Sequence, residues 1–182
     1  MKKSLPLIMA IFISLSVCSQ NKAEENKKSS KMEQFASQTG SIIKFLDYSL
    51  PNLKSMYGVA ETKVRKIIAG ESVAYFFQIS KEGKYDTKKA SIAYEDLLEV
   101  IKAISVLKTD SEIDILVVAD YLENKFVTDD GFQIGYYVSD SKITWYIVLE
   151  KYGSGNTVFL KNLSEIEESF LNAKQKIDDL KQ

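Results

Sequence analysis

The chain has 182 residues, 45% of them hydrophobic, with a formal charge of −1, no histidine and one cysteine, Cys18. This length suits one domain or two small ones, and the near-neutral charge is not that of a nucleic-acid binder. Without histidine, and with a single cysteine, the chain cannot use Ser-His-Asp or Cys-His catalysis, histidine zinc sites, histidine-ligated haem, iron–sulfur clusters or an intrachain disulfide.

The first residues have the composition of an export signal. Met1-Lys2-Lys3 precedes an apolar run, Leu5 to Val17, that is too short to span a membrane as a helix. A basic start before such a run is typical of a secretory signal peptide. We therefore expect residues 1–19 to be a signal peptide and the protein to be exported, to the periplasm or outside the cell.

Two interpretations of signal cleavage remain open. Leu15-Ser16-Val17-Cys18 resembles the bacterial lipoprotein box, which implies a lipid on Cys18, although Val17 departs from the small residue of that box. Alternatively, Val17-Cys18-Ser19 suits an ordinary signal peptidase and leaves Gln20 first. Membrane contact is expected only through a lipid anchor at Cys18. In the second case the basic count falls from 24 to 22 against 25 acids, a net charge of −3.

The rest of the chain is predicted to be a polar tail followed by one α+β domain. Residues 20–32 are charged and without periodicity, which predicts disorder. Residues 33–182 form the predicted domain. Residues 40–50 look extended and end at Pro51, further strands are predicted over 62–69, 73–80 and 88–94, and a helix over 95–108. Residues 111–119 fit either a continuation of that helix or a buried strand.

The second half of the domain repeats this order. A strand over 121–128 and a turn at Asp129-Asp130-Gly131 precede three antiparallel strands within 131–160. A two-residue turn at Asp140-Ser141 sets Gly135 opposite Tyr146, whose ring is expected to cover the bare glycine. A helix is predicted from Ser164 to about Leu180, with a capping box formed by Ser164 and Glu167.

The predicted fold class is α+β, with an antiparallel β-meander sheet or sheets and two amphipathic helices. Shifting the first half by 70 positions aligns the turns of residues 39–108 with those of 121–181, which weakly suggests a repeated ββββα unit. The alternative is that any strand–helix alternation of this length can be aligned in this way.

Tyrosine provides the main candidate binding residues, with ten tyrosines against one tryptophan. Tyr137, Tyr146, Thr144 and Gln133 share the sheet face opposite the apolar one. That face is either covered by a helix or is a surface for a protein or glycan, because tyrosine is enriched at interfaces. Arg65 is expected either to stack on Phe76 or to bind an anion.

Acidic residues are concentrated between residues 109 and 141, with eight acids against Lys125 alone. This stretch is predicted to be a solvated connector, or else a surface for a basic partner. The pattern from Asp110 begins like a calcium loop but lacks its glycine and closing glutamate, so no metal site and no cofactor are predicted. Five acids could supply the carboxylate pair of a glycosidase: Asp120, Glu123, Asp129, Asp130 and Asp140.

These observations predict an exported, non-catalytic binding protein with an unknown protein or glycan partner and no nucleic-acid partner. The alternatives are a carboxylate-dependent glycan hydrolase, or a small inhibitor or immunity-type protein that binds another protein. The acidity would suit a basic target in the last case. No motif assigns the chain to a family.

Overall fold

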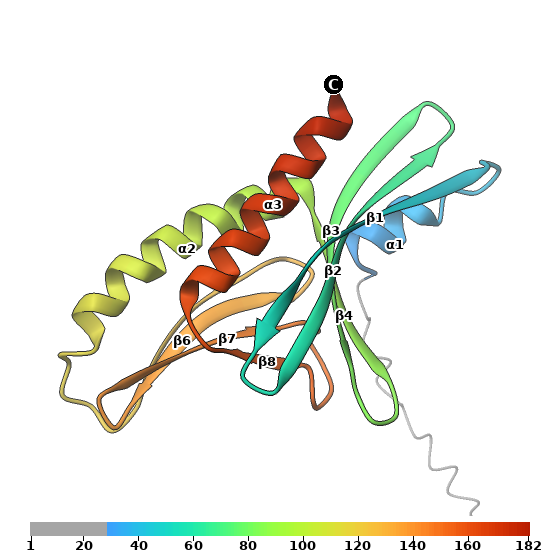
Figure 1. Cartoon of the computed structure of the whole chain (residues 1–182). Coiled ribbons are helices and arrows are strands. Elements are labelled where there is room, and N and C mark those ends of the chain that lie inside the picture. The colour runs from blue at the N-terminus through green and yellow to red at the C-terminus, as the bar shows by residue number, and fades with distance from the viewer. Residues whose placement is uncertain (1–28) are drawn as a thin grey trace, which may run out of the picture.

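The computed structural model describes residues 29–182 as an α+β fold with one eight-stranded antiparallel sheet and three helices in that range (Figure 1). The predicted signal peptide, its two cleavage interpretations and Cys18 lie outside the described residues. None of the helices in the described part is long and apolar enough to cross a membrane.

Four strands and a helix follow one another twice after a short first helix. The elements are α1 Lys31–Ala36, β1 Ile43–Ser55, β2 Gly58–Ala69, β3 Ser72–Glu82, β4 Thr87–Ala93, α2 Tyr94–Asp114, β5 Leu122–Val127, β6 Gln133–Ser139, β7 Lys142–Val148, β8 Thr157–Leu160 and α3 Leu163–Lys181. The strand order in the sheet is β4-β3-β2-β1-β8-β7-β6-β5. The two four-stranded meanders meet where Ser55 pairs with Leu160 and the Met56 N–H donates to the Phe159 carbonyl at 2.8 Å.

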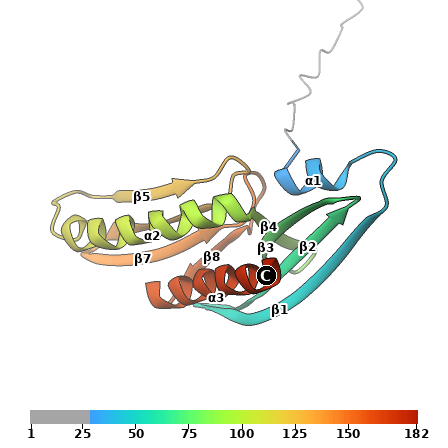
Figure 2. The same cartoon turned by 90° about the horizontal axis from the view of Figure 1, so that it is seen from above.

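The long helices α2 and α3 lie side by side on one face of the sheet (Figure 2). They cross between the meanders, because α2 follows β4 yet also packs on β5 and β6, whereas α3 follows β8 and packs on β1 and β2. At the centre, the ring of Phe170 lies 5.1 Å from that of Phe77 and 5.9 Å from that of Phe132. The two meanders therefore share one hydrophobic core.

The short helix α1 covers the other face of the sheet, on the first meander. Met32 and Phe35 pack against a small buried cluster of Ile67, Phe76 and Ala93. Its N-terminus has a capping box, in which the Ser30 hydroxyl accepts from the Glu33 N–H at 3.2 Å and the Glu33 carboxylate accepts from the Ser30 N–H at 2.9 Å. The expectation of two helices is therefore corrected to three, and α1 begins within the last residues of the predicted tail.

The strand β1 continues past Pro51, where the sequence predicted its end. The register with β2 shifts between Leu50 and Leu53, and the Thr62 hydroxyl donates to the Pro51 carbonyl at 2.8 Å. At such a bulge one residue makes no backbone hydrogen bond to the neighbouring strand. Proline, which has no N–H to donate, can therefore occupy this position without breaking the pairing of β1 with β2. The strand therefore reaches Ser55.

The ends of both long helices also differ from prediction. Helix α2 runs to Asp114, so residues 111–114 continue the helix, and the buried-strand interpretation of 111–119 is wrong because Leu116 and Val118 are exposed. Helix α3 is capped by Asn162, which accepts from the Glu165 N–H at 3.1 Å. The predicted capping box starting at Ser164 is therefore wrong, whereas the helix is amphipathic as predicted, with Ile166, Phe170, Ala173 and Ile177 buried on one side.

The central hairpins form as predicted. Val138 pairs with Ile143 and Gly135 with Tyr146. Asp140 and Ser141 have φ angles of 50° and 56°, the left-handed values that a two-residue type I′ turn requires at both positions. The turn thus fixes the register in which one face of β6 and β7 is buried under the helices. In this register Tyr137 and Tyr146 lie on the opposite face.

Candidate functional site

The predicted tyrosine site lies on the sheet face that α2 and α3 do not cover. Ile134 and Tyr136 of β6 face the helices and are fully buried, so Gln133 and Tyr137 face the opposite way because side chains alternate along a strand. Among the described helices, α1 also contacts this side of the sheet, but on β2 and β4. We call the side of β5–β8 that carries Tyr137 the helix-free face.

Five aromatic side chains lie across the helix-free face, in two groups of contacting rings that are joined by the register pair of Tyr146 and Phe159. Tyr121 stacks on Tyr137 with centroids 6.0 Å apart, and Tyr137 lies 6.4 Å from Tyr146. Tyr146 pairs with Phe159 of β8, whose ring meets the edge of Tyr57 at 6.4 Å. We call these five residues the aromatic row. Its ends are open to solvent, with Tyr57 82% and Tyr121 59% exposed, whereas Tyr146 at its centre is 5% exposed.

The buried centre of the row is held by a carboxylate. The Tyr146 hydroxyl donates to Glu123, which also pairs with Lys125 at 3.5 Å. Burial, and then this hydrogen bond, raises the pKa of Tyr146 above its usual range. Tyr146 is therefore fixed beside Tyr137, and the exposed aromatic side chains of the row are Tyr121 and Tyr57 at its ends.

Gly135 pairs with Tyr146 as predicted, and its lack of a side chain is required by its neighbour on β5. A Cβ at this position would lie 2.4 Å from the Asn124 carbonyl oxygen and 2.7 Å from the Lys125 Cβ. These atoms belong to the adjacent strand, whose Lys125 is the register partner of Gly135. The glycine thus lets β5 approach β6 closely, a contact that alternation along β6 alone does not predict.

The other predicted site residues are distributed across the sheet. Thr144 is the register partner of Tyr137, and Gln133 sits at the opposite end of β6, both half-buried. Arg65 lies on β2, with β1, β8 and β7 between it and β6. The structure therefore groups Tyr137, Tyr146 and Thr144 and leaves Arg65 apart from them.

Arg65 is fully engaged by neighbours on β1. Its guanidinium donates twice to Asp47 at 2.7 Å and lies 5.5 Å from the centroid of the Phe45 ring. Its register partner is Phe76 as predicted, but the expected stacking on the Phe76 ring is wrong, because Phe45 provides the ring. Arg65 and Lys63 hold the pKa of the Asp47 carboxyl far below its usual range. The Arg65 charge is thus neutralised by Asp47.

The acidic stretch is not a single connector. Asp114 accepts from the Tyr136 hydroxyl at 2.5 Å and Asp110 accepts from the Asn124 amide at 3.2 Å, so two of its acids join α2 to the second meander. Both acids lie within helix α2. Within residues 29–182, no group of three or more acidic or cysteine side chains is placed to hold a metal ion.

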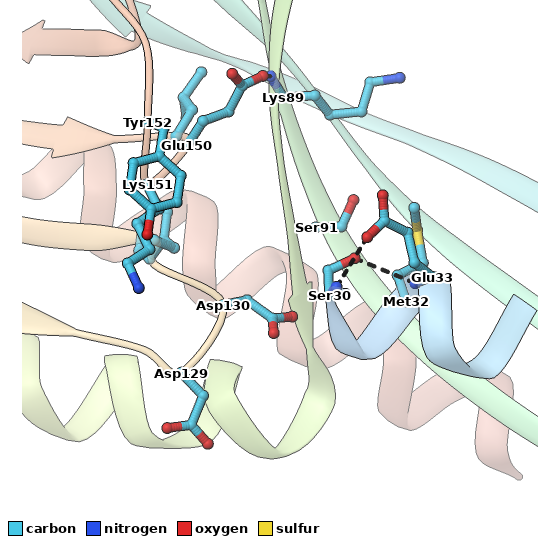
Figure 3. Close-up of a pocket in the computed structure, with 12 residues that line it drawn as sticks. Ser30, Met32, Glu33, Lys89, Ser91, Asp129, Asp130, Glu150, Lys151 and Tyr152 are labelled. Carbon is cyan, nitrogen blue, oxygen red and sulfur yellow. Dashed lines mark hydrogen bonds between the residues drawn. The ribbon is translucent and has the colours of Figure 1, made fainter. Parts of the chain in front are cut away.

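A cleft of about 390 Å³ lies between the meanders and beside α1 (Figure 3). Its lining residues are Ser30, Met32, Glu33, Lys89, Ser91, Asp129, Asp130, Phe132, Leu149, Glu150, Lys151 and Tyr152. Of the five acids proposed for a glycosidase pair, Asp129 and Asp130 line the cleft, and Glu150 joins them. Figure 3 shows Glu150 and Tyr152 on one side and Ser30 and Glu33 on the other, with Asp130 between them.

Asp130 is a half-buried acid of this cleft. It accepts from the Lys31 N–H at 2.9 Å, while the Lys31 ammonium pairs with buried Asp96 at 2.5 Å. Burial raises the pKa of Asp130, and the Lys31 N–H opposes that rise. The arrangement ties the start of α1 to the Asp129–Asp130 turn.

Sequence reasoning missed three members of the aromatic row. Phe159 lies within the last of the three predicted strands, but the connection over residues 149–156 that sets it opposite Tyr146 is too long for its register to be predicted. Tyr121 lies in the strand predicted over 121–128, but the pairing of β5 with β6 that sets it beside Tyr137 was not predicted. Tyr57 lies in the β1–β2 turn. The position of this turn was not predicted, because β1 continues past the bulge at Pro51, where the sequence predicted its end.

The chain matches no protein-family model, no curated protein sequence and no solved structure at a significant level. Its function must therefore be argued from the geometry above.

Proposed function

We propose that this is an exported, non-catalytic binding protein that recognises a partner protein with the helix-free face of its second meander. The observation that carries the proposal is the aromatic row, with Tyr57 and Tyr121 exposed at its ends. Exposed, well-supported tyrosines are over-represented among residues that dominate interface energies. The hydrogen bond from Tyr146 to Glu123 supports this, because it fixes Tyr146 beside Tyr137 before any partner arrives.

The experiment compares three forms of the chain starting at Gln20, immobilised and exposed to cell-envelope extract of the producing cell. One is wild type, one carries Tyr57→Ser with Tyr121→Ser, and the third is a matched control, Tyr85→Ser. Tyr85 is 88% exposed in the β3–β4 turn, away from the row. We expect wild type and control to retain the same component, and the double variant to bind it at least about tenfold more weakly. Equal retention by all three refutes the proposal.

A glycan hydrolase is the second candidate, favoured by the cleft. The raised pKa of Asp130 is a property of general acids in such enzymes, and Glu150 supplies a second carboxylate in the same cavity. Hydrolysis of purified envelope glycans by the wild-type chain, abolished by Asp130→Asn, would establish this function in place of the first. The control is Asp86→Asn, in the β3–β4 turn and outside the cleft lining.

Export, the lipid on Cys18 and the ββββα repeat are parts of the same proposal. Mass spectrometry of the mature N-terminus decides between lipidated Cys18 and free Gln20, and an intact Met1 contradicts export. The order β1–β4 then α2, followed by β5–β8 then α3, supports a repeat. Superposing the two halves of a crystal structure tests it: the repeat requires equivalent residues to lie about 70 positions apart, as the sequence alignment proposes.

A further inference from the structure

The connection between α2 and β5 exposes an uninterrupted run of large apolar side chains. Leu116 is 80%, Val117 47% and Val118 102% exposed, and Ile113 on the last turn of α2 is 64% exposed. We call these four residues the apolar tip. Three consecutive exposed apolar residues are disfavoured in soluble proteins unless they have a function.

The backbone of the apolar tip is held in place although its side chains face solvent. The Leu116 N–H donates to the Ile113 carbonyl at 3.0 Å and the Val117 N–H to the Asp114 carbonyl at 3.1 Å. The Asp114 carboxylate in turn accepts from the hydroxyl of Tyr136, a core residue, at 2.5 Å. A fixed turn loses little conformational freedom on binding, so its apolar surface is available at low entropic cost.

The sequence around the apolar tip is acidic and contains no base. Between Lys108 and Lys125 the chain has no lysine or arginine and five acids, Asp110, Glu112, Asp114, Asp120 and Glu123. Glu112 and Asp120 are exposed beside the tip. A partner must therefore combine an apolar centre with a border of positive charge.

We propose that the apolar tip docks into an apolar pocket of a partner protein whose rim carries lysine and arginine. The inference rests on the proposed function, because Tyr121 joins the tip to the aromatic row through its stacking on Tyr137. Charge disfavours the two other occupants. A symmetric contact with a second copy brings two acidic borders together, and an anionic bilayer surface repels the same acids.

The test measures fluorescence anisotropy of two labelled amphipathic peptides of equal length, one of leucine and lysine and one of leucine and glutamate. The protein forms are wild type, Leu116→Ser with Val118→Ser, and the control Leu171→Ser, which removes a 53% exposed leucine from α3. We expect the lysine peptide to bind wild type and control alike and to bind the tip variant about tenfold more weakly. Binding of the glutamate peptide should be at least tenfold weaker, and raised salt should reduce this difference.

Several outcomes overturn the proposal: equal affinity for both peptides, equal loss in the Leu171→Ser control, self-association that depends on Val118, or binding to vesicles of phosphatidylethanolamine and phosphatidylglycerol that depends on Val118. These failures are distinguishable from failure of the proposed function. If the tip variant still retains the envelope component while the Tyr57 and Tyr121 variant loses it, the inference fails and the proposed function stands.

Discussion

Replacing Tyr146 by alanine removes the buried centre of the aromatic row. The side chain is 5% exposed and its hydroxyl donates to Glu123. Truncating a buried aromatic residue to alanine costs about 3–5 kcal/mol, a large part of the roughly 5–15 kcal/mol that stabilises a typical domain. Tyr146→Phe isolates the hydrogen bond. Because the Glu123 side chain is 31% exposed, we expect that change to cost only about 1 kcal/mol.

The assay is urea unfolding followed by the fluorescence of Trp145, the single tryptophan, whose ring lies 4.8 Å from that of Tyr136. With a slope of about 2 kcal/mol per molar urea, the midpoint of Tyr146→Ala should fall by roughly 1.5–2.5 M. Exposed Tyr85→Ala serves as control and should stay within about 0.5 kcal/mol of wild type. An unchanged midpoint for Tyr146→Ala refutes the reasoning.

The pH dependence of the same variants gives an independent check. Burial and Glu123 raise the pKa of Tyr146 above its ordinary value of 10.0. The unfolded chain therefore ionises this hydroxyl first, so its stabilising contribution is complete below pH 10 and is lost as pH rises toward the folded-state pKa. Between pH 10 and 11 the wild type should lose stability more steeply than Tyr146→Phe. If the stability of wild type and of Tyr146→Phe falls equally between pH 10 and 11, the pKa of the Tyr146 hydroxyl is not raised in the folded state.

Three further changes have expected effects on stability, measured by the same urea unfolding. Gly135→Ala should destabilise the fold by about 1–3 kcal/mol, because its Cβ would lie 2.4 Å from a carbonyl oxygen of β5. A variant as stable as wild type would show that β5 is not held at this distance from β6. Asp47→Asn should remove a contribution that is present above the unfolded-state pKa and lost as pH falls below about 4, because Arg65 lowers the folded-state pKa. The stability of this variant should therefore fall less than that of wild type as the pH is lowered. The difference should be about 1 kcal/mol at most, because the Arg65–Asp47 pair is partly exposed. Ser141→Gly should stabilise by about 0.5–1 kcal/mol, because the residue has a φ of 56°, and a lower midpoint contradicts this.

The sequence predicts well those parts of the fold that local patterning controls. Alternation over β6 and β7, with the two-residue turn at Asp140-Ser141, gave the register of the central hairpin residue by residue. The apolar stripe of α3 was equally readable, since a buried helix face repeats with the helical period. In both cases the signal lies within fewer than twenty residues.

The features that sequence reasoning missed depend on contacts between distant segments. The crossing of α2 onto β5 and β6, and of α3 onto β1 and β2, leaves no local trace. The same holds for the partners of Arg65, because Asp47 and Phe45 lie on a strand whose register was shifted by the bulge at Pro51. The candidate site was therefore predictable only in part. Tyr137 and Tyr146 follow from alternation along β6 and β7, whereas Tyr57 joins the row through the junction of the two meanders, which has no local signal in the sequence.

The most direct measurement of the central claim is photo-crosslinking in the producing cell, with benzoylphenylalanine placed at Tyr121 or at Tyr85. Both side chains are exposed, but only Tyr121 belongs to the aromatic row. We predict a discrete crosslinked protein from position 121 and none from position 85. Crosslinking from position 85 alone, or from neither position, would contradict recognition through the helix-free face.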